Sequence, residues 1–317
     1  MKNDERRARQ SPKQSISIIG AGRMGTALAL ALNSHGYRIE AVAARHKPHA
    51  RRAAKLISEP TLALSQTELD LLPQSDILFI TTPDDAIETT ADSITAMIES
   101  AKTKRAGKHE GARVALHASG ALSSDVLRSL KRVGFATGSL HPLASVSDPV
   151  HGAESLSTAF FCIEGDPLAR SLARSLVRSL GAKSFSISMK DKALYHAAAV
   201  MASGHVTALF DIAVEMLARC GLATGRAREV LLPLLRSTLE NLYLSDPAHA
   251  LTGTFARADA ATVSRHLAAL NAQEMKDALA VYRLLGLRSL KLAKAAGANV
   301  SALREMERLL ELEDERA

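Results

Sequence analysis

The sequence predicts an α/β fold: a doubly wound, mainly parallel sheet followed by an all-α C-terminal domain. Two observations carry this prediction. Short apolar runs alternate with helical stretches in the first part of the chain, which is the pattern of βαβ units. After Asp191, apolar residues recur at helical spacing almost to the end of the chain. We therefore expect one domain at residues 14–188 and a helical domain at residues 189–317.

The expected strands and helices follow one another in a regular order. The run ILFI at 77–80 is uniformly apolar, as a parallel strand covered on both faces should be. The expected strands are 15–19, 37–44, 76–81, 113–117, 135–140, 159–164 and 183–188. The expected helices of the first domain are 26–34, 49–56, 86–100, 124–133 and the amphipathic segment RSLARSLVRSL. Breaks in the later helices are expected near Gly221, Asp246-Pro247, Gly253 and Gly297.

Charge and hydropathy restrict the partners that we expect. Part of the net charge of +7 lies in the segment Met1–Lys13, which has almost no apolar residues and should be solvated. The terminal ELEDERA should be frayed. No basic helix is interleaved with aromatic residues, so we expect no nucleic-acid partner. No apolar run reaches the roughly 20 residues that span a bilayer, so we expect no membrane partner.

The two cysteines, Cys162 and Cys220, lie far apart and belong to no CxxC motif or Cys/His cluster. We expect both to be small buried side chains of a protein in a reducing compartment. No secretory signal follows the charged start of the chain. These observations predict a cytoplasmic protein without a bound metal.

A glycine-rich turn is the strongest local motif. The first apolar run ends in a turn that opens an Ala/Leu-rich helix, and the turn reads Gly20-Ala21-Gly22-Arg23-Met24-Gly25. In this context the first glycine permits a tight turn, the second lets the backbone approach a diphosphate, and the third allows close helix packing. The N–H groups at the helix start favour an anion. The motif predicts a Rossmann domain with cofactor contacts at Gly20, Gly22, Arg23, Met24 and Gly25; the alternative is a turn without a ligand.

The end of the second expected strand distinguishes NADP from NAD. NAD sites usually place an acid about 20 residues beyond the glycines to hold the ribose 2′-hydroxyl. This chain has Arg45, His46 and Lys47 there and no acid. The planar fork of Arg45 can pair with a 2′-phosphate, so NADP is the expected cofactor and NAD the less favoured one. The alternative is an exposed basic loop.

Further polar residues stand at the ends of later strands, where ligands bind in open α/β sheets. Thr82 and Pro83 should line the cofactor cleft, whereas Asp84 or Asp85 should start the next helix. His117, followed by Ser119-Gly120, should face the cofactor, with Ser119 near the nicotinamide. His141 ends another strand and is a candidate catalytic residue.

Lys192 and His196 form the third group of candidate catalytic residues. They lie about one helical turn apart and therefore share one helix face. Both are suitable donors for protonating or polarising a carbonyl or imine during hydride transfer. The alternative is a solvated lysine beside a histidine at the edge of the core.

These motifs together resemble a known family. The chain is similar to Rossmann-like proteins with a C-terminal helical domain of unknown function, a branch of the 6-phosphogluconate dehydrogenase-like superfamily near pyrroline-5-carboxylate reductase. The matching segments are IIGAGRMGTALA, TTPDDAI, HASGAL, SLHPL, KALYHAAAVMASGHVTAL and ALTGTFARAD. The resemblance implies a helical substrate domain that also mediates homodimerisation.

The resemblance also implies roles for individual residues. Lys192 matches a lysine that works at the substrate in related dehydrogenases, and His196 matches its polar partner. Ser119-Gly120 is similar to their substrate loop. Three positions depart from the pattern: Gly204 stands where Asn is expected, and Thr254 and Ala258 replace a Pro and a Gly.

The sequence therefore predicts an NADP-dependent oxidoreductase. Hydride would pass between NADP(H) and a small carbonyl, hydroxy acid or imine, with Lys192, His196, His141 and Ser119 at the substrate. Two alternatives stay open. One is a regulatory or scaffold protein that binds NADP without turnover. The other is an enzyme that passes hydride between NADP and a deazaflavin.

Overall fold

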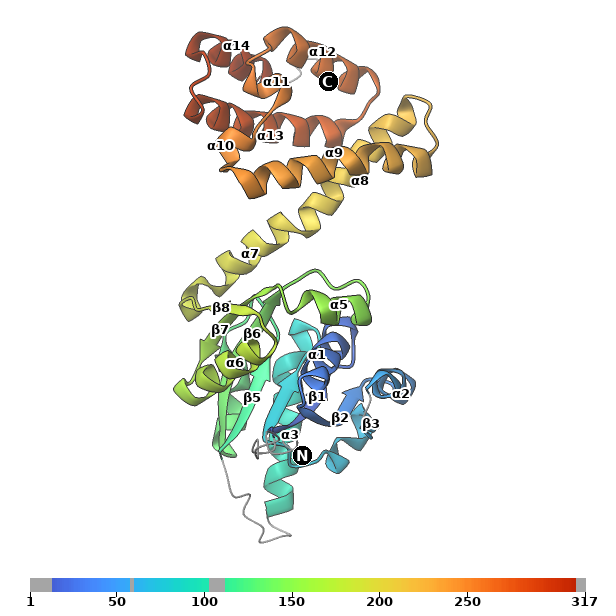
Figure 1. Cartoon of the computed structure of the whole chain (residues 1–317), viewed down its shortest axis with the longest axis vertical. Helices are drawn as coiled ribbons and strands as arrows, with labels where there is room; N and C mark the ends of the chain where they lie inside the picture. Colours follow the sequence, from blue (N-terminus) through green and yellow to red (C-terminus); the bar gives the residue numbers. More distant parts are fainter. Residues whose placement is uncertain (1–12, 58–59, 103–111, 312–317) are drawn as a thin grey trace, which may run out of the picture. The chain divides into compact units, whose positions relative to one another are not determined.

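The computed structural model describes residues 13–57, 60–102 and 112–311 (Figure 1). The segments expected to be solvated or frayed, before Lys13 and after Glu311, lie outside the described residues. The chain divides into two compact units, Met1–Ser203 and Gly204–Ala317. The first unit includes the first helix after Ser188, where the sequence changes to helical spacing. Each unit is described by itself below.

Within the described residues, eight strands form one sheet in the order β3-β2-β1-β4-β5-β6-β7-β8. The first six have the strand order of dinucleotide-binding Rossmann sheets. All neighbouring strands are parallel except β6 and β7, which pair antiparallel. This confirms the predicted mainly parallel sheet. The strands are β1 (Ser15–Ile19), β2 (Arg38–Ala44), β3 (Leu62–Ser65), β4 (Ile77–Ile80), β5 (Arg113–His117), β6 (Phe135–Leu143), β7 (Phe160–Gly165) and β8 (Lys183–Phe185).

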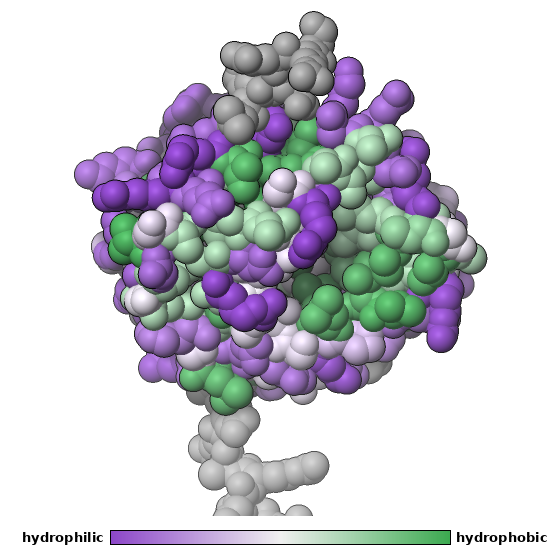
Figure 2. Space-filling view, turned by 90° about the horizontal axis from the view of Figure 1, so that it is seen from above, coloured by the Kyte–Doolittle hydropathy of each residue, from purple (hydrophilic) through white to green (hydrophobic). Residues whose placement is uncertain are grey.

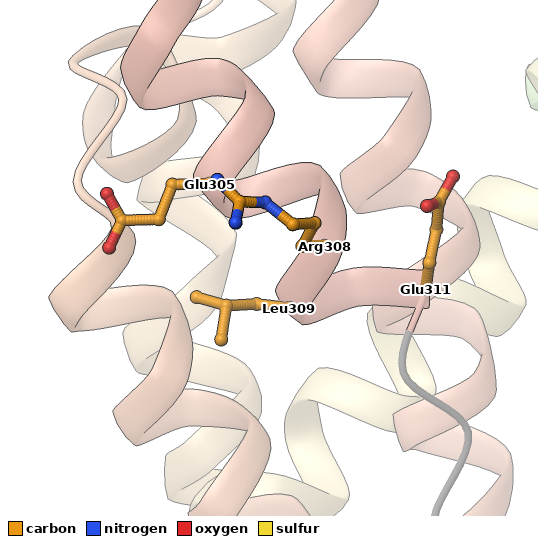
Figure 3. Close-up of a pocket in the computed structure, with 4 residues that line it drawn as sticks. All are labelled: Glu305, Arg308, Leu309 and Glu311. Atoms are coloured by element: carbon orange, nitrogen blue, oxygen red, sulfur yellow. The ribbon is translucent and has the colours of Figure 1, made fainter.

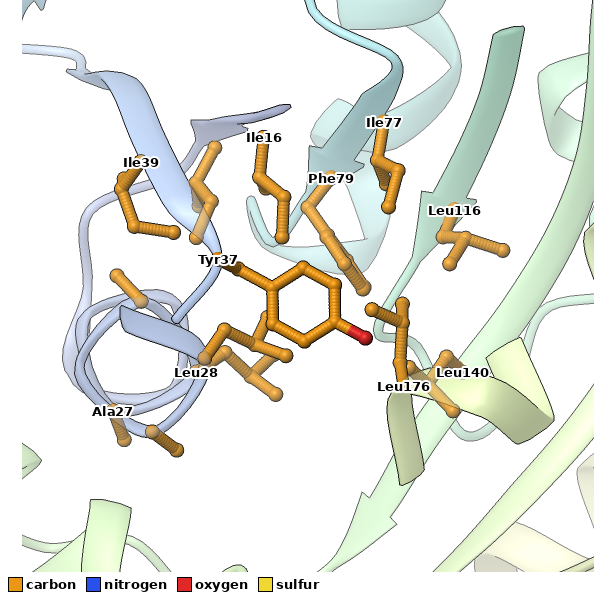
Figure 4. Packing of buried hydrophobic residues seen from close by; sticks show 14 of the residues in the cluster. Ile16, Ala27, Leu28, Tyr37, Ile39, Ile77, Phe79, Leu116, Leu140 and Leu176 are labelled. Atoms are coloured by element: carbon orange, nitrogen blue, oxygen red, sulfur yellow. The ribbon is translucent and has the colours of Figure 1, made fainter. Parts of the chain in front are cut away.

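Helices cover both faces of the sheet. Successive residues of β4 alternate between two cores: Phe79 packs with the helices on one face, and Ile80 packs with those on the other. Figure 4 shows the first core, where Tyr37 and Phe79 lie among aliphatic side chains. The helices of this unit are α1 (Arg23–Ser34), α2 (Lys47–Leu56), α3 (Asp84–Lys102), α4 (Arg128–Arg132), α5 (Pro149–Ser155), α6 (Pro167–Ser179) and α7 (Lys192–Ala202). The shorter 3₁₀ turns are η1 (Gln66–Leu71), η2 (Ser124–Leu127) and η3 (Met189–Asp191).

Some elements differ from the sequence prediction. Strand β3 was not expected, because this edge strand is short and has one buried residue, Leu64. Helix α5 was not expected either, although Asp148 caps it and Pro149 occupies its first turn. The helix expected at 124–133 is divided into η2 and α4.

The second unit is helical throughout its described part. Its main core joins Val263, Leu290, Met306 and Leu310. Gly286 of α13 (Lys276–Ala295) packs against Leu310 so closely that a Cβ there would lie 2.9 Å from it. The helices are α8 (Gly204–Arg219), α9 (Thr224–Leu244), α10 (Pro247–Ala250), α11 (Gly253–Ala256), α12 (Ala260–Ala272), α13 (Lys276–Ala295) and α14 (Val300–Glu311). Breaks lie near the positions that the sequence predicts, and two further breaks, at 257–259 and at 273–275, were not predicted.

Two expectations from composition meet a different result. Cys162 is buried, but Cys220 is exposed at the end of α8, so the prediction of two buried cysteines is wrong for Cys220. One stretch of the described chain, Met189–Arg219, is helical, long and apolar enough to cross a membrane by length and composition. Histidines and small residues separate its apolar side chains, which is why no long apolar run stands out in the sequence.

Candidate active site

The glycine turn joins β1 to α1 at the carboxyl edge of the sheet. Gly20 has φ +110°, and a Cβ there would lie 2.4 Å from the carbonyl carbon of Thr81. The N–H groups of Gly20 and Ala21 both donate to the carbonyl of Ala43, at 2.8 and 2.9 Å. Glycine is therefore required at position 20, since the turn presses against the end of β4 and has a positive φ.

The other two glycines have opposite surroundings. A Cβ at Gly25 would lie 2.2 Å from the carbonyl oxygen of Gly20, so α1 packs directly on the turn. At Gly22, no described atom lies within 4 Å of the Cβ position. The structure thus has a tight contact at Gly25 and open space at Gly22, as a turn that admits a diphosphate needs.

The start of α1 offers free hydrogen-bond donors. Among the described residues, no acceptor is bonded to the backbone N–H groups of Arg23, Met24 and Gly25, and Gly22 provides no side-chain cap. Nearby, Thr82 has a buried hydroxyl oxygen that no described group hydrogen-bonds. Unpaired donors at a helix N-terminus and an unpaired buried hydroxyl fit the phosphates and ribose of a dinucleotide.

The end of β2 carries a basic cluster. Arg45 and His46 are exposed, and no described side chain pairs with the guanidinium of Arg45. Lys47, by contrast, is bound to Glu68, and that contact together with Ser65 lowers the pKa of Glu68 to about 2. Arg45 is therefore available to a ligand, whereas Lys47 is tied to η1.

Ser119, a predicted catalytic residue, organises the loop after β5. Its hydroxyl donates to Asp84 Oδ2 at 2.8 Å and accepts from the N–H groups of Ala121 and Leu122. The hydroxyl is thereby fully used within the protein. Asp84 starts α3, beside the exposed Pro83, so this contact joins the loop after β5 to the loop after β4.

Lys192 lies beneath the same loop and is 1% exposed. Its Nζ donates to the carbonyl oxygen of Ser119 at 3.0 Å and to Ser139 Oγ at 2.7 Å. Burial lowers the pKa of the Lys192 amine below its usual value, while Cys162, Glu164 and Asp84 oppose that shift. The amine thus anchors the Ser119 peptide from inside the unit.

His117 is buried, and both of its ring nitrogens are engaged. Nδ1 accepts from the N–H of Ser119, and Nε2 lies 3.1 Å from the carbonyl of Ser123. This fixes the neutral ring with its proton on Nε2. Burial first and Lys192 second lower the pKa of His117 to about 3. His117 therefore supports the loop from below and presents no free nitrogen to a cofactor in this structure.

His141 and His196 converge at Gly120. Their rings meet edge to face with centroids 5.7 Å apart. A Cβ at Gly120 would lie 2.5 Å from His196 Cδ2 and 2.8 Å from His141 Nε2. Burial, then Lys192 and His196, lower the pKa of His141 to about 4, so this ring is neutral at neutral pH. His141 Nδ1 lies 2.6 Å from the hydroxyl of Tyr195.

The structure thus brings Ser119, Lys192, His141 and His196 together around one loop. It also adds Tyr195 and Ser139, which the sequence analysis did not select, and it gives contacts to Gly120 and Asp84, which were expected only as part of the loop and as a helix start. Tyr195 and Gly120 contact the histidines, while Ser139 and Asp84 hold Lys192 and Ser119. These hydrogen bonds join positions far apart in the chain, so no local motif marks them. Tyr195 lies within the segment Lys190–His196. Its helical spacing to Lys192 places both side chains on one helix face, and this spacing could have marked Tyr195 as a site residue.

A hollow on the described surface of the second unit does not show comparable chemistry. It lies on α14 and is lined by Glu305, Arg308, Leu309 and Glu311 (Figure 3). Among the described residues, no group of three or more His, Cys, Asp or Glu side chains could hold a metal ion. The carboxyl edge of the sheet is therefore the candidate active site.

Two family models match the sequence. Residues 1–142 match the Rossmann-like domain, and residues 159–289 match a domain of unknown function (DUF2520). The chain combines a Rossmann-like domain with a DUF2520 domain. This confirms the resemblance to Rossmann-like proteins with a C-terminal domain of unknown function, whereas the place in the 6-phosphogluconate dehydrogenase-like superfamily stays a prediction. No curated protein matches the chain.

Solved structures share the fold of this Rossmann-like and DUF2520 pair. A Bacteroides fragilis protein described as a candidate NADP oxidoreductase is 21% identical, with a TM-score of 0.70 over 88% of this chain and 99% of its own. A Thermotoga maritima protein is 21% identical, with a TM-score of 0.65 over 89% and 99%. Pyrroline carboxylate reductase of Plasmodium falciparum, with NADP bound, is 13% identical, with a TM-score of 0.54 over 95% and 99%.

Proposed function

We propose that this protein is an NADP-dependent oxidoreductase that transfers hydride between NADP(H) and a small carbonyl, hydroxy acid or imine. One observation carries the proposal. The turn at Gly22 is open, and the N–H groups that follow it have no described acceptor. A diphosphate would supply the missing acceptors, and the unpaired hydroxyl of Thr82 would face the same ligand.

The choice of NADP rests on the end of β2. Arg45 is exposed there and free of described partners, and no acid occupies the position that would hold a ribose 2′-hydroxyl. The guanidinium can make paired hydrogen bonds to a 2′-phosphate. The Plasmodium reductase of the same fold is described with NADP bound, which agrees with this choice.

The residues around Gly120 would hold the substrate. When bound, NADP(H) supplies or accepts the hydride. Neutral His141 can donate a hydrogen bond to a substrate oxygen, and His196 flanks the same position. Lys192 and Ser119 act on the loop: Lys192 fixes the Ser119 carbonyl, and Ser119 ties the loop to α3.

A second function is favoured by a different observation. The polar groups of Lys192, Ser119 and His117 are satisfied inside the unit, so three predicted contact residues offer little to a substrate. A regulatory or scaffold protein that binds NADP without turnover would have this property. The two proposals differ in whether bound NADPH is ever oxidised.

The test is to measure NADPH binding by fluorescence and NADPH oxidation by absorbance, with a panel of small carbonyl compounds and imines. NADP⁺ with small hydroxy acids tests the reverse direction. We expect saturable NADPH binding and turnover with at least one panel member. Tight binding with no turnover would favour the regulatory protein, and absence of binding would contradict both proposals. Gly22→Asp provides the control that should bind no cofactor.

We also propose that the protein is a homodimer formed through its helical unit. Figure 2 shows hydrophobic patches on the surface between hydrophilic areas. In the helical unit, α9 exposes a series of large apolar side chains: Val230, Leu232, Leu234, Leu239, Leu242, Tyr243 and Leu244. A second copy would bury such residues. A small-molecule substrate, a cytoplasmic location and the absence of nucleic-acid and membrane partners stay predictions from the sequence.

A further inference from the structure

The pair of Tyr195 and His141 has the geometry of a positioned donor. The hydroxyl oxygen of Tyr195 lies 2.6 Å from His141 Nδ1. The two rings meet edge to face, with centroids 5.6 Å apart. Phe185, at the end of β8, packs on the tyrosine ring with centroids 5.8 Å apart. Tyr195 is therefore held by α7 on one side and by the sheet on the other.

The protonation states of both partners allow the phenol to donate this hydrogen bond. Burial, together with the thiol of Cys162, raises the pKa of Tyr195, so the phenol keeps its proton. The pKa of His141 is lowered to about 4, so the imidazole carries one proton at neutral pH. The groups that face His141 are Lys192 and His196 on α7, His117 on β5, and Cys162 opposite it on β7.

We propose that Tyr195 positions His141: the phenol donates to Nδ1, and the imidazole proton is thereby kept on Nε2. A neutral imidazole has one N–H, and the hydrogen bond made by the other nitrogen selects the tautomer. Nε2 is the atom next to Gly120, and among the described residues none accepts a hydrogen bond from it. The pair thus leaves one donor free at the loop.

This arrangement restricts the substrate groups that the site can activate. This restriction rests on the proposed function. A neutral Nε2–H donates a hydrogen bond but carries no additional proton to release. The site would therefore polarise an acceptor oxygen, such as a carbonyl, by hydrogen bonding. Tyr195 acts through His141 and is a positioning residue.

The test is nuclear magnetic resonance of protein labelled with ¹⁵N-histidine, recorded without cofactor or substrate. Long-range ¹H–¹⁵N spectra distinguish the two neutral tautomers and imidazolium, and His141→Asn assigns the signals. We expect His141 of the unaltered protein to be the Nε2–H tautomer at neutral pH. The Nδ1–H tautomer would overturn the proposal without any variant being needed.

Tyr195→Phe keeps the ring and removes the hydroxyl. We expect a mixture of His141 tautomers and a pKa of His141 raised by about one unit, because a donor to the neutral form is lost. The signals of His117, which Ser119 and Ser123 fix separately, report that the variant is folded. Phe185→Leu is the matched control: it loosens the packing, keeps the hydroxyl and should keep the tautomer.

An unchanged tautomer and pKa of His141 in folded Tyr195→Phe would overturn the role of Tyr195. An equal change in Phe185→Leu would assign the effect to packing alone and would also overturn it. Because the spectra need neither NADPH nor turnover, this result is independent of the proposed oxidoreductase activity.

Discussion

Two buried histidines show how the fold changes the pKa of single residues. His117 and His141 lose hydration beside the buried amine of Lys192, and both have pKa values well below 6.5. Their neutral forms are needed to accept hydrogen bonds at Nδ1, from the N–H of Ser119 in His117 and, as proposed above, from Tyr195 in His141. The unfolded chain binds protons on both residues as the pH falls through 6.5, whereas the folded chain does not. Folding is therefore favoured above pH 6.5 and loses stability as the pH falls towards 3.

We predict that His117→Asn reduces the loss of stability on acidification. One histidine with its folded pKa near 3 accounts for a loss of about 2 kcal/mol in the free energy of unfolding between pH 7.5 and 5. Urea unfolding at the two pH values measures it. His151→Asn, at an exposed histidine on α5, is the control. Its free energy of unfolding should fall by as much as that of the unaltered protein. Equal losses in all three proteins would contradict the buried neutral state of His117.

We predict that Arg45→Ala weakens NADPH binding far more than NADH binding. Loss of charge-assisted hydrogen bonds to a 2′-phosphate should raise the Kd for NADPH by about 10- to 100-fold, whereas the Kd for NADH should change by less than about threefold. Titration calorimetry with both cofactors measures the two constants. Arg38→Ala is the control, because Arg38 lies at the opposite end of β2 and pairs with Glu40. Equal effects of Arg45→Ala on both cofactors would remove the argument for NADP.

At the scale of elements, two glycines of one turn have different roles: one supports stability and the other allows ligand binding. Gly25 lets α1 pack on the turn, whereas Gly22 borders open space. We predict that Gly25→Ala lowers the free energy of unfolding by about 1–3 kcal/mol, because its Cβ would overlap the Gly20 carbonyl. Gly22→Ala should change it by less than about 0.5 kcal/mol. Urea unfolding compares the two variants, and a larger loss in Gly22→Ala would show that the turn is wrongly described.

Elements with strong local patterns could be predicted from the sequence. Strands β1 and β5 begin and end where their apolar runs do, because both are buried on two faces. Strand β3 could not be predicted, since an edge strand needs little apolar sequence and depends on pairing with β2. Strand β6 runs three residues beyond its predicted end at Leu140, to Leu143, because β7 pairs with it antiparallel.

The candidate site was predictable in part for a similar reason. Its histidines and lysine stand out at strand ends and on one helix face. Their neighbours do not: Ser139 and Tyr195 acquire a role through hydrogen bonds to Lys192 and His141 that join separate elements. The alternative of a solvated Lys192 is wrong, because the side chain is buried and tertiary packing decides which side of a helix is covered.

At the scale of the whole molecule, the exposed apolar residues of α9 predict self-association. We expect light scattering after size exclusion to give twice the mass of the 33.8 kDa chain. Leu234→Glu should shift the protein towards the monomer, because a charge would be buried at the contact. Arg236→Ala, at another residue of the same helix, should leave the mass unchanged. A monomer without any substitution would contradict the dimer.

The central claim is that the free N–H groups at the start of α1 hold the diphosphate of NADP. Its most direct test is calorimetric titration of NADPH into the unaltered protein and into Gly22→Asp. The variant places a carboxylate in the open space of the turn, and we predict that the Kd rises at least about 100-fold with unchanged folding. Equal affinity of the two proteins would contradict the account.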